Sequence, residues 1–443
     1  MDRSKPTTAI PEPWSINTWQ SKSIAQPIIY EDEDKLSKTL VQLAALPDLV
    51  PTQEIDQLCE TLLFAARGQM FVVQGGDCAE AFHEITRPIV SGKRELLVAQ
   101  AKTLSEGLGK PIIPIGRIAG QYSKPRSNCY ETLSCGSRVN SYRGDNVNGP
   151  EKSERDPNPE RLCVGYHLAA ATLSMLRAES GQPRTEIERF TLPSSGVFTS
   201  HEALHLPLES TMTRFGYNTS AHMLWIGERT RQLDGGHVEY LRGVKNPVGV
   251  KLGPTTNPSD LIEMLDKLNP RGTVGKIILI TRMGAKNVED KLPALIREIK
   301  KSNHVPVWLC DPCHGNTVST PSKVKTRIVE QMLEELKLTH LIHAENDSQL
   351  GGIHIEQTGE ADVTECLDSY SQDLSQAQFP EYRTLCDPRL SKSQAMFLIR
   401  EYVQFAKALA QEASQVETIN LELVHGSKEQ VLLKTAPGLA LQV

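Results

Sequence analysis

Short apolar runs recur along the chain, and each ends in glycine or polar residues. Between most runs the apolar positions follow helical spacing, as at residues 259–268, 288–301 and 325–337. This alternation is typical of parallel strands joined by crossover helices. Because there are eight runs, the pattern favours an α/β fold with a closed (β/α)8 barrel, the TIM barrel, over a doubly wound sheet. The predicted strands are residues 70–74, 111–115, 196–199, 223–227, 248–252, 277–281, 305–309 and 352–356.

The same pattern divides the chain into three parts. A proline-rich start and two helical patterns, at 34–46 and 53–67, precede the first predicted strand. A further helical pattern at 393–413 follows the last strand and is expected to close the barrel. The predicted parts are an N-terminal extension at 1–67, the barrel at 68–415 and a C-terminal tail at 416–443.

One segment of the barrel, residues 127–195, is irregular and rich in glycine and proline. It contains a single helical stretch at 162–178. The segment is too long for a simple connection between a strand and a helix. We therefore expect an insertion after the second strand, packed over the mouth of the barrel.

Composition narrows the class of protein. With 39% hydrophobic and 23% charged residues, the chain is in the globular range. A formal net charge of -6 argues against nucleic-acid partners, which require a basic excess. No apolar run is long enough to span a membrane, and the first residues lack the apolar core of a signal peptide, so we expect a cytoplasmic protein with no membrane partner. Nine cysteines, an odd number scattered over a long chain, fit reduced thiols better than disulfides.

Reactive or charged side chains stand at the end of every predicted strand. Barrel enzymes build their active sites from such positions, because the carboxyl ends of the strands meet at one face. A purely structural barrel needs only ordinary polar residues there. We therefore expect an active site at this face, with side chains from Cys78, Arg117, Ser200, His201, Glu202, Glu228, Arg229, Lys251, Arg282, His314 and Glu356.

Cationic residues are concentrated near these strand ends, although the chain as a whole is acidic. Guanidinium groups match phosphate and carboxylate in a two-point geometry, so several anionic groups are expected to bind. Each cation alone reads equally well as a surface salt-bridge partner. The set consists of Arg117, Lys124, Arg126, Arg229, Lys251 and Arg282. The tetrapeptide Lys124-Pro125-Arg126-Ser127 is a short, stiff element whose polar groups can converge on one phosphate.

A second set of side chains has the character of metal ligands. Two glycines before Cys78 allow the chain to turn at a strand end and present the thiol, although an inert buried cysteine stays an open alternative. With His314, Glu356 and Asp387 this thiol forms a mixed sulfur, nitrogen and oxygen set. Such a set suits Mn, Fe, Co or Zn better than Mg, which prefers oxygen.

The segment Cys310-Asp311-Pro312-Cys313-His314 also matches the spacing of a c-type haem attachment site and contains a redox-type CxxC motif. Haem attachment normally requires export, and no signal peptide is evident. A redox CxxC precedes a helix, whereas this one follows an apolar strand. The histidine is the better candidate for a functional residue.

Eleven motifs, in order, resemble those of the type II (class II) 3-deoxy-D-arabino-heptulosonate 7-phosphate (DAHP) synthases. The resemblance covers about residues 14 to 410. The motifs are QGGDCAE at 74–80, GRIAGQ at 116–121, KPRS at 124–127, SYRGD at 141–145, TSHE at 199–202, WIGERTRQ at 225–232, VKLGP at 250–254, RMG at 282–284, HGNT at 314–317, GIHIE at 352–356 and CDPRL at 386–390.

The resemblance implies a transferase of the shikimate pathway, which leads to chorismate and the aromatic amino acids. Phosphoenolpyruvate and D-erythrose 4-phosphate would condense with water to give DAHP and phosphate. The implied cofactor is a divalent metal ion, with Mn or Co preferred over Zn or Fe. The implied assembly is a homo-oligomer, either a dimer or a tetramer. The implied metal ligands are Cys78, His314, Glu356 and Asp387.

The resemblance also assigns substrate and catalytic residues. Erythrose 4-phosphate would bind Lys124, Pro125, Arg126 and Ser127. Phosphoenolpyruvate would bind Arg117, Glu228, Arg229, Lys251 and Arg282. The implied catalytic residues are Lys251, Glu202 and Glu228, the first two for proton transfer around the attacking water.

Two features depart from the family pattern. Cys313 stands where the family commonly has methionine, which places an oxidisable thiol beside His314. The stretch between Arg117 and Glu228 is shorter than in long, feedback-regulated members. We therefore expect weak or no inhibition by tryptophan and phenylalanine, as in short forms that feed secondary metabolism. Two alternatives stay open: an aminoDAHP synthase variant and a catalytically idle regulatory homologue.

Overall fold

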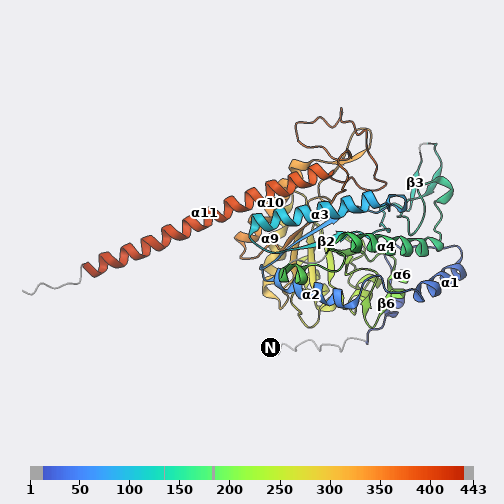
Figure 1. The fold of residues 1–443 in the computed structure, drawn as a ribbon, viewed down its shortest axis with the longest axis horizontal. Coiled ribbons are helices and arrows are strands. Elements are labelled where there is room, and N and C mark those ends of the chain that lie inside the picture. Colours follow the sequence, from blue (N-terminus) through green and yellow to red (C-terminus); the bar gives the residue numbers. More distant parts are fainter. Residues whose placement is uncertain (1–12, 134, 182–184, 434–443) are drawn as a thin grey trace, which may run out of the picture.

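The computed structural model describes residues 13–133, 135–181 and 185–433, with side chains described up to residue 412. Eight parallel strands close into a barrel in the order β1-β14-β11-β10-β9-β8-β5-β2, which confirms the predicted (β/α)8 barrel. Helices surround the strands (Figure 1). The barrel strands are β1 (Phe71–Gly76), β2 (Ile112–Arg117), β5 (Phe198–Glu202), β8 (Met223–Ile226), β9 (Val248–Leu252), β10 (Ile277–Thr281), β11 (Val307–Cys310) and β14 (Gly352–Glu356).

The α-helices in the described part of the chain surround or extend from this barrel. They are α1 (Glu33–Ala44), α2 (Thr52–Ala66), α3 (Arg87–Leu108), α4 (Glu160–Glu179), α5 (Glu186–Thr191), α6 (Leu206–Thr211), α7 (Gly236–Leu241), α8 (Pro258–Leu268), α9 (Val288–Lys301), α10 (Val329–Glu345) and α11 (Lys392–Leu433). Within these residues, none of the helices combines the length and apolarity that crossing a bilayer requires.

The barrel strands are buried on both faces, which explains why they read as nearly continuous apolar runs. Inside the barrel, Val72, Ile115, Trp225 and Ile280 belong to one packed cluster. Helix α2 contributes Leu58, Leu62 and Ala65 to the same cluster. This helix therefore packs against the interior at one end of the barrel.

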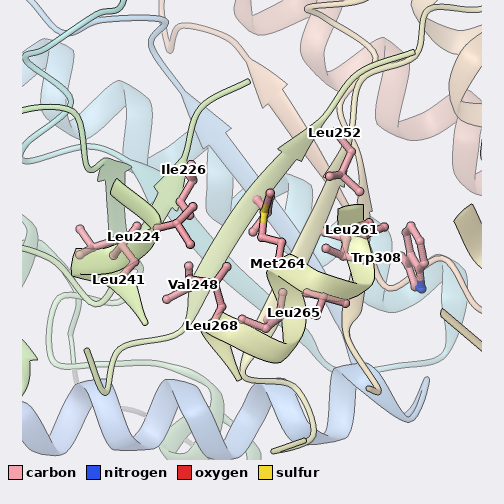
Figure 2. Close-up of a cluster of buried hydrophobic side chains, with 14 of the residues drawn as sticks. Leu224, Ile226, Leu241, Val248, Leu252, Leu261, Met264, Leu265, Leu268 and Trp308 are labelled. Carbon is pink, nitrogen blue, oxygen red and sulfur yellow. The ribbon is translucent and has the colours of Figure 1, made fainter. Parts of the chain in front are cut away.

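Helix α8 illustrates how the outer layer forms. Asn257 caps its start by accepting hydrogen bonds from the backbone of Ser259 and Asp260, and Pro258 occupies the first turn. The buried positions recur three and four residues apart, so one face of the helix is apolar. Figure 2 shows this face packed against the strands. The contacting set comprises Leu261, Met264, Leu265 and Leu268 from the helix with Leu224, Ile226, Val248 and Leu252 from the strands.

The segment between β2 and β5 contains both a crossover helix and an unexpected hairpin. Its long helix α4 packs against α3 and α1, as a crossover helix between two parallel strands does. A parallel pair of strands requires such a crossover. An unexpected hairpin precedes the helix, made of β3 (Tyr130–Thr132) and β4 (Arg138–Asn140). Residues 134 and 182–184 of the predicted insertion lie outside the described part.

Three other boundaries also differ. Residues expected to begin a helix at 325 form strand β13 (Lys325–Arg327), paired with β12 (Thr317–Ser319), and α10 begins only at Val329. Strand β5 continues to Glu202, beyond its predicted end at 199. The last helix, α11, continues to Leu433, beyond its predicted end at 413, and extends away from the barrel (Figure 1). A short hairpin of β6 (Thr213–Arg214) and β7 (Tyr217–Asn218) precedes β8. Residues 1–12 and 434–443 of the predicted extension and tail lie outside the described part.

Candidate active site

A cavity of about 340 Å³ opens at the carboxyl ends of the barrel strands. Ten of the residues selected from the sequence line it: Arg117, Lys124, Pro125, Glu202, Glu228, Arg229, Lys251, Arg282, His314 and Asp387. Four lining residues were not selected: Trp225, Gly227, Thr317 and Lys325. The structure thus brings together side chains that are nearly 300 residues apart in the sequence, between positions 117 and 387.

The predicted metal ligands converge beside this cavity. Cys78 Sγ and carboxylate oxygens of Glu356 and Asp387 all lie within 4.8 Å of one another. The Nε2 atom of His314 is 3.0 Å from Glu356 Oε1. Cys78 follows β1, Glu356 ends β14 and Asp387 lies in the loop before α11, so three separate elements deliver the donors.

The surroundings of this cluster favour a cation. The Lys124 ammonium lies 2.6 Å from Cys78 Sγ and 3.1 Å from Asp387 Oδ2. A positively charged group is therefore already stabilised among the donors. Together with a thiol, an imidazole and two carboxylates, this arrangement fits a borderline divalent metal ion.

Glu356 is fixed and ionised. Burial alone would raise the pKa of its carboxyl group, but the charges of His314, Lys124, Arg327 and Arg117 together lower that pKa well below its usual range. Arg327 is fully buried, and its Nη2 lies 2.7 Å from Glu356 Oε2. Arg117 Nη2 lies 2.9 Å from the other oxygen. The carboxylate is consequently held from two sides.

A buried ionic network joins the two chain segments that carry Cys78 and Asp387. Arg389 Nη1 lies 2.7 Å from Asp77 Oδ1, and Lys93 Nζ lies 2.5 Å from Asp77 Oδ2. Arg389 also pairs with Glu365 at 3.0 Å. Because Asp77 precedes Cys78 and Arg389 follows Asp387 by two positions, this network fixes the distance between the two donors.

Two cationic residues of the cavity wall are tightly held. Arg117 Nε donates to Asp77 O, its guanidinium lies over the Trp225 ring, and only part of its donor capacity is left for a ligand. Lys251 donates to the buried carboxylate of Asp311. Burial lowers the pKa of Lys251 to about 8, and the Asp311 charge partly opposes that shift.

Two carboxyl groups in the cavity have an unpartnered oxygen among the described residues, Glu202 Oε1 and Glu228 Oε2. Burial raises the pKa of Glu202, and the surrounding cations only partly offset this effect. The other oxygen of Glu228 accepts from Arg231 Nη2 at 2.7 Å. Glu202 is thus suited to carry a proton, and both groups have a free acceptor directed to buried space.

The predicted phosphate-binding tetrapeptide is only partly gathered at the cavity. Lys124 and Pro125 line it, but Lys124 is directed at the metal-ligand cluster. Arg126 pairs with Glu131 Oε2 of the unexpected hairpin at 3.1 Å. Ser127 Oγ accepts from Arg229 Nη2 at 2.8 Å. Arg126 and Ser127 do not line the cavity in this conformation.

Two buried carboxylates that support the site were not anticipated. Asp311 bonds Lys251 and lies 2.7 Å from His314 Nδ1, so it links an anion-binding cation to a predicted metal ligand. Glu335 of α10 accepts from the backbone of Met283 and Gly284, in the loop that follows Arg282. The only sequence signal for Asp311 was its place in the CxxC-like motif. Glu335 lies on a buried helix face that also carries Gln331 and Thr339, and no motif singled it out.

The fold and the site define an enzyme of the TIM-barrel class, with a cavity at the carboxyl ends of the strands that is lined by cationic side chains beside a group of potential metal ligands. The family model described as Class-II DAHP synthetase matches residues 14–192 and 184–402. The chain belongs to this family.

Curated relatives named phospho-2-dehydro-3-deoxyheptonate aldolase match along almost their whole length. The chain is 39% identical to the one from Neurospora crassa, over 90% of this chain and 96% of that relative. It is 37% identical to the one from Streptomyces coelicolor, over 87% and 96%, respectively. It is 36% identical to one from Mycolicibacterium smegmatis, over 86% and 93%.

Proposed function

We propose that this chain condenses phosphoenolpyruvate with D-erythrose 4-phosphate and water to form DAHP and phosphate, the first step of the shikimate pathway. The observation that carries the proposal is a cavity in which six lysine and arginine side chains lie beside a cluster of thiol, imidazole and carboxylate donors. The names of the relatives, which denote DAHP synthase, support the same reaction.

In this proposal the two anionic substrates occupy different parts of the cavity. Phosphoenolpyruvate binds the wall that ends strands β2, β8, β9 and β10, through Arg117, Glu228, Arg229, Lys251 and Arg282. Erythrose 4-phosphate binds near Lys124, Pro125, Arg126 and Ser127. When erythrose 4-phosphate binds, Arg126 leaves Glu131, Ser127 leaves Arg229, and both side chains turn toward the phosphate of the substrate.

Cys78, His314, Glu356 and Asp387 would hold the divalent metal ion, Mn or Co before Zn or Fe. When bound, such an ion supplies Lewis acidity toward the aldehyde oxygen of erythrose 4-phosphate. The protein fixes both substrates in reacting contact, which removes much of the entropic cost of a two-substrate reaction.

The proposed reaction forms one carbon–carbon bond and one carbon–oxygen bond to water, and it breaks the carbon–oxygen bond to phosphate. C3 of phosphoenolpyruvate attacks the aldehyde carbon, and water adds to the resulting cationic C2. The bond from C2 to the phosphate oxygen then breaks. Glu202 and Lys251 transfer protons around the water, and Glu228 orients it through its unpartnered oxygen.

An isotope experiment tests this sequence of bonds. Phosphoenolpyruvate labelled with ¹⁸O at the oxygen between C2 and phosphorus is incubated with the enzyme, Mn and erythrose 4-phosphate. The proposal expects DAHP by mass spectrometry and the label in the released phosphate. Absence of DAHP, or label retained in the sugar, contradicts the proposal. Replacing erythrose 4-phosphate by its imino analogue in a parallel reaction separates the amino-sugar variant.

A further inference from the structure

A fully buried imidazole lies behind the cavity wall and has no role in the chemistry described above. His354 is an interior residue of β14, and its Nε2 atom is 2.6 Å from Arg117 Nη1. The same Nε2 atom is 2.7 Å from Lys251 Nζ. Trp225 meets the imidazole edge-on, with 5.7 Å between ring centroids. Two cationic residues of the cavity therefore meet at one nitrogen atom.

The contacts of Arg117 determine which nitrogen of His354 carries the proton. A guanidinium group is always charged and can only donate hydrogen bonds. Nε2 must therefore offer its lone pair, and in the neutral ring the proton resides on Nδ1. Gln74 Oε1 lies 2.7 Å from Nδ1 and accepts that proton.

A relay of hydrogen bonds fixes the same tautomer from the opposite side. Gln74 Nε2 donates to Ser200 Oγ at 2.9 Å, and this orients the amide so that its oxygen faces His354. The Ser200 hydroxyl donates to the carbonyl oxygen of Gly116 at 2.9 Å. A carbonyl oxygen can only accept a hydrogen bond. Each hydrogen bond of the relay, which runs from the Gly116 carbonyl through Ser200, Gln74 and His354 to the Arg117 guanidinium, therefore has one possible direction. The relay crosses β2, β5, β1 and β14.

The relay addresses an electrostatic problem of the site. Two positive charges in a buried site repel each other, and the repulsion is stronger than in water because the surroundings are less polar. Glu356 offsets the charge of Arg117 on one side, and Asp311 offsets that of Lys251 on the other. Among the described residues, only the lone pair of His354 contacts both cations. No anion could take this place without neutralising the charge that the substrates need.

We propose that His354 is a positioning residue for the condensation: its Nε2 lone pair holds Arg117 and Lys251 together, so that both act on one anionic substrate. Gln74 and Ser200 maintain the tautomer that makes this possible. The inference rests on the proposed function, since phosphoenolpyruvate is the substrate that both cations would bind. His354 itself does not touch the substrate.

Kinetics of two His354 variants test the positioning role. In His354→Leu the new side chain has a similar volume but no hydrogen-bond acceptor. KM for phosphoenolpyruvate should therefore rise at least tenfold, and kcat should fall. KM for erythrose 4-phosphate should change less than threefold. His354→Gln can place a carboxamide oxygen near the Nε2 position and should recover most of the loss in KM. A matched control is His343→Leu, because His343 is an equally buried histidine on α10 that bonds only Ser348 among the contacts described. This control should keep wild-type kinetics.

A second measurement does not depend on activity and reads the tautomer in the wild-type enzyme. The wild-type enzyme is labelled with ¹⁵N-histidine, and the ring resonances of His354 are assigned as those that disappear in His354→Gln. If that variant does not fold, they are assigned as the resonances that shift in Gln74→Met. The expected signature is a neutral ring protonated on Nδ1. A ring protonated on Nε2, or on both nitrogens at pH 7, overturns the proposal. So does a folded His354→Leu variant with wild-type KM and kcat. Failure of the wild-type enzyme to form DAHP instead rejects the proposed function and leaves the tautomer test intact.

Discussion

At the scale of residues, burial determines the chemistry of the cavity more than residue type does. Glu202 and Lys251 both lie deep in the barrel mouth, where the charged form of each is disfavoured. The pKa values of an acid and a base therefore move toward neutrality from opposite sides. Such a pair suits proton transfer near neutral pH.

The alkaline limb of the pH profile should report Lys251. Its pKa is lowered to about 8, so its ammonium form, which binds anions, prevails below pH 8 and is lost above it. We expect kcat/KM for phosphoenolpyruvate to fall as pH rises from 8 to 9. In Lys251→Arg the charge persists to much higher pH, so this limb should disappear even if activity is lower. An unchanged limb in that variant would assign the titration to another group.

The network around Arg389 should contribute strongly to stability. Among the described residues, Arg389→Met leaves the buried carboxylate of Glu365 without its cationic partner and leaves Asp77 with Lys93 alone. Removing one partner of a buried ion pair typically costs about 3–5 kcal/mol. Urea unfolding should show a loss of this size in the free energy of unfolding. Lys392→Met is the control, because its pairing with Glu95 is exposed and should change stability by less than about 1 kcal/mol.

Much of the site could be predicted because barrel topology converts strand ends into neighbours. Seven of the residues selected at strand ends line the cavity, and Cys78 and Glu356, which were selected in the same way, lie beside it. His354 was missed because it lies inside an apolar strand, where the sequence does not reveal its polar partners. The position of Arg126 was missed because its partner Glu131 belongs to a hairpin that the sequence pattern did not indicate.

At the scale of elements, the apolar face of each outer helix attaches it to the barrel. This pattern predicted α8 and α9 closely, since the buried positions keep helical spacing. It failed at residues 325–327, where strand β13 pairs with β12 and Arg327 is directed to Glu356. Tertiary pairing there overrides local propensity, which a periodicity argument does not capture.

Helix α8 offers a direct test of this packing. Leu265 is completely buried between the helix and the strands, so Leu265→Ala should lower the free energy of unfolding by about 2–5 kcal/mol. Chemical denaturation measures this change. Ile262→Ala, at a partly buried position on the same helix, should cost less. Equal losses at the two positions would contradict the assigned face of α8.

At the scale of the whole molecule, the barrel has a packed interior and one open face. Apolar side chains fill the interior together with α2, and the cavity lies at the carboxyl ends of the strands. Eight apolar runs were sufficient to predict this architecture. The role of α4 was missed although the predicted barrel already made its second and third strands neighbours, because residues 127–195 were interpreted as an insertion and not as the crossover between those strands.

The connection between β2 and β5 leads to a prediction about regulation. In its described residues this connection has one long helix, α4, and one short helix, α5. On the expectation that this stretch is shorter than in long, feedback-regulated members of the family, we expect no strong inhibition by tryptophan or phenylalanine. Initial rates measured with each amino acid up to 1 mM, roughly the upper range of physiological ligand levels, should stay within twofold of the uninhibited rate. Strong inhibition at micromolar concentration would refute this expectation.

Phosphate release from phosphoenolpyruvate tests the central claim most directly. The enzyme is treated with a chelator, then assayed with and without erythrose 4-phosphate, before and after Mn or Co is restored. The account predicts phosphate release only when both the aldose and the metal ion are present, and loss of that release in Cys78→Ser. Release without erythrose 4-phosphate, or release that persists in the chelated enzyme, would contradict it.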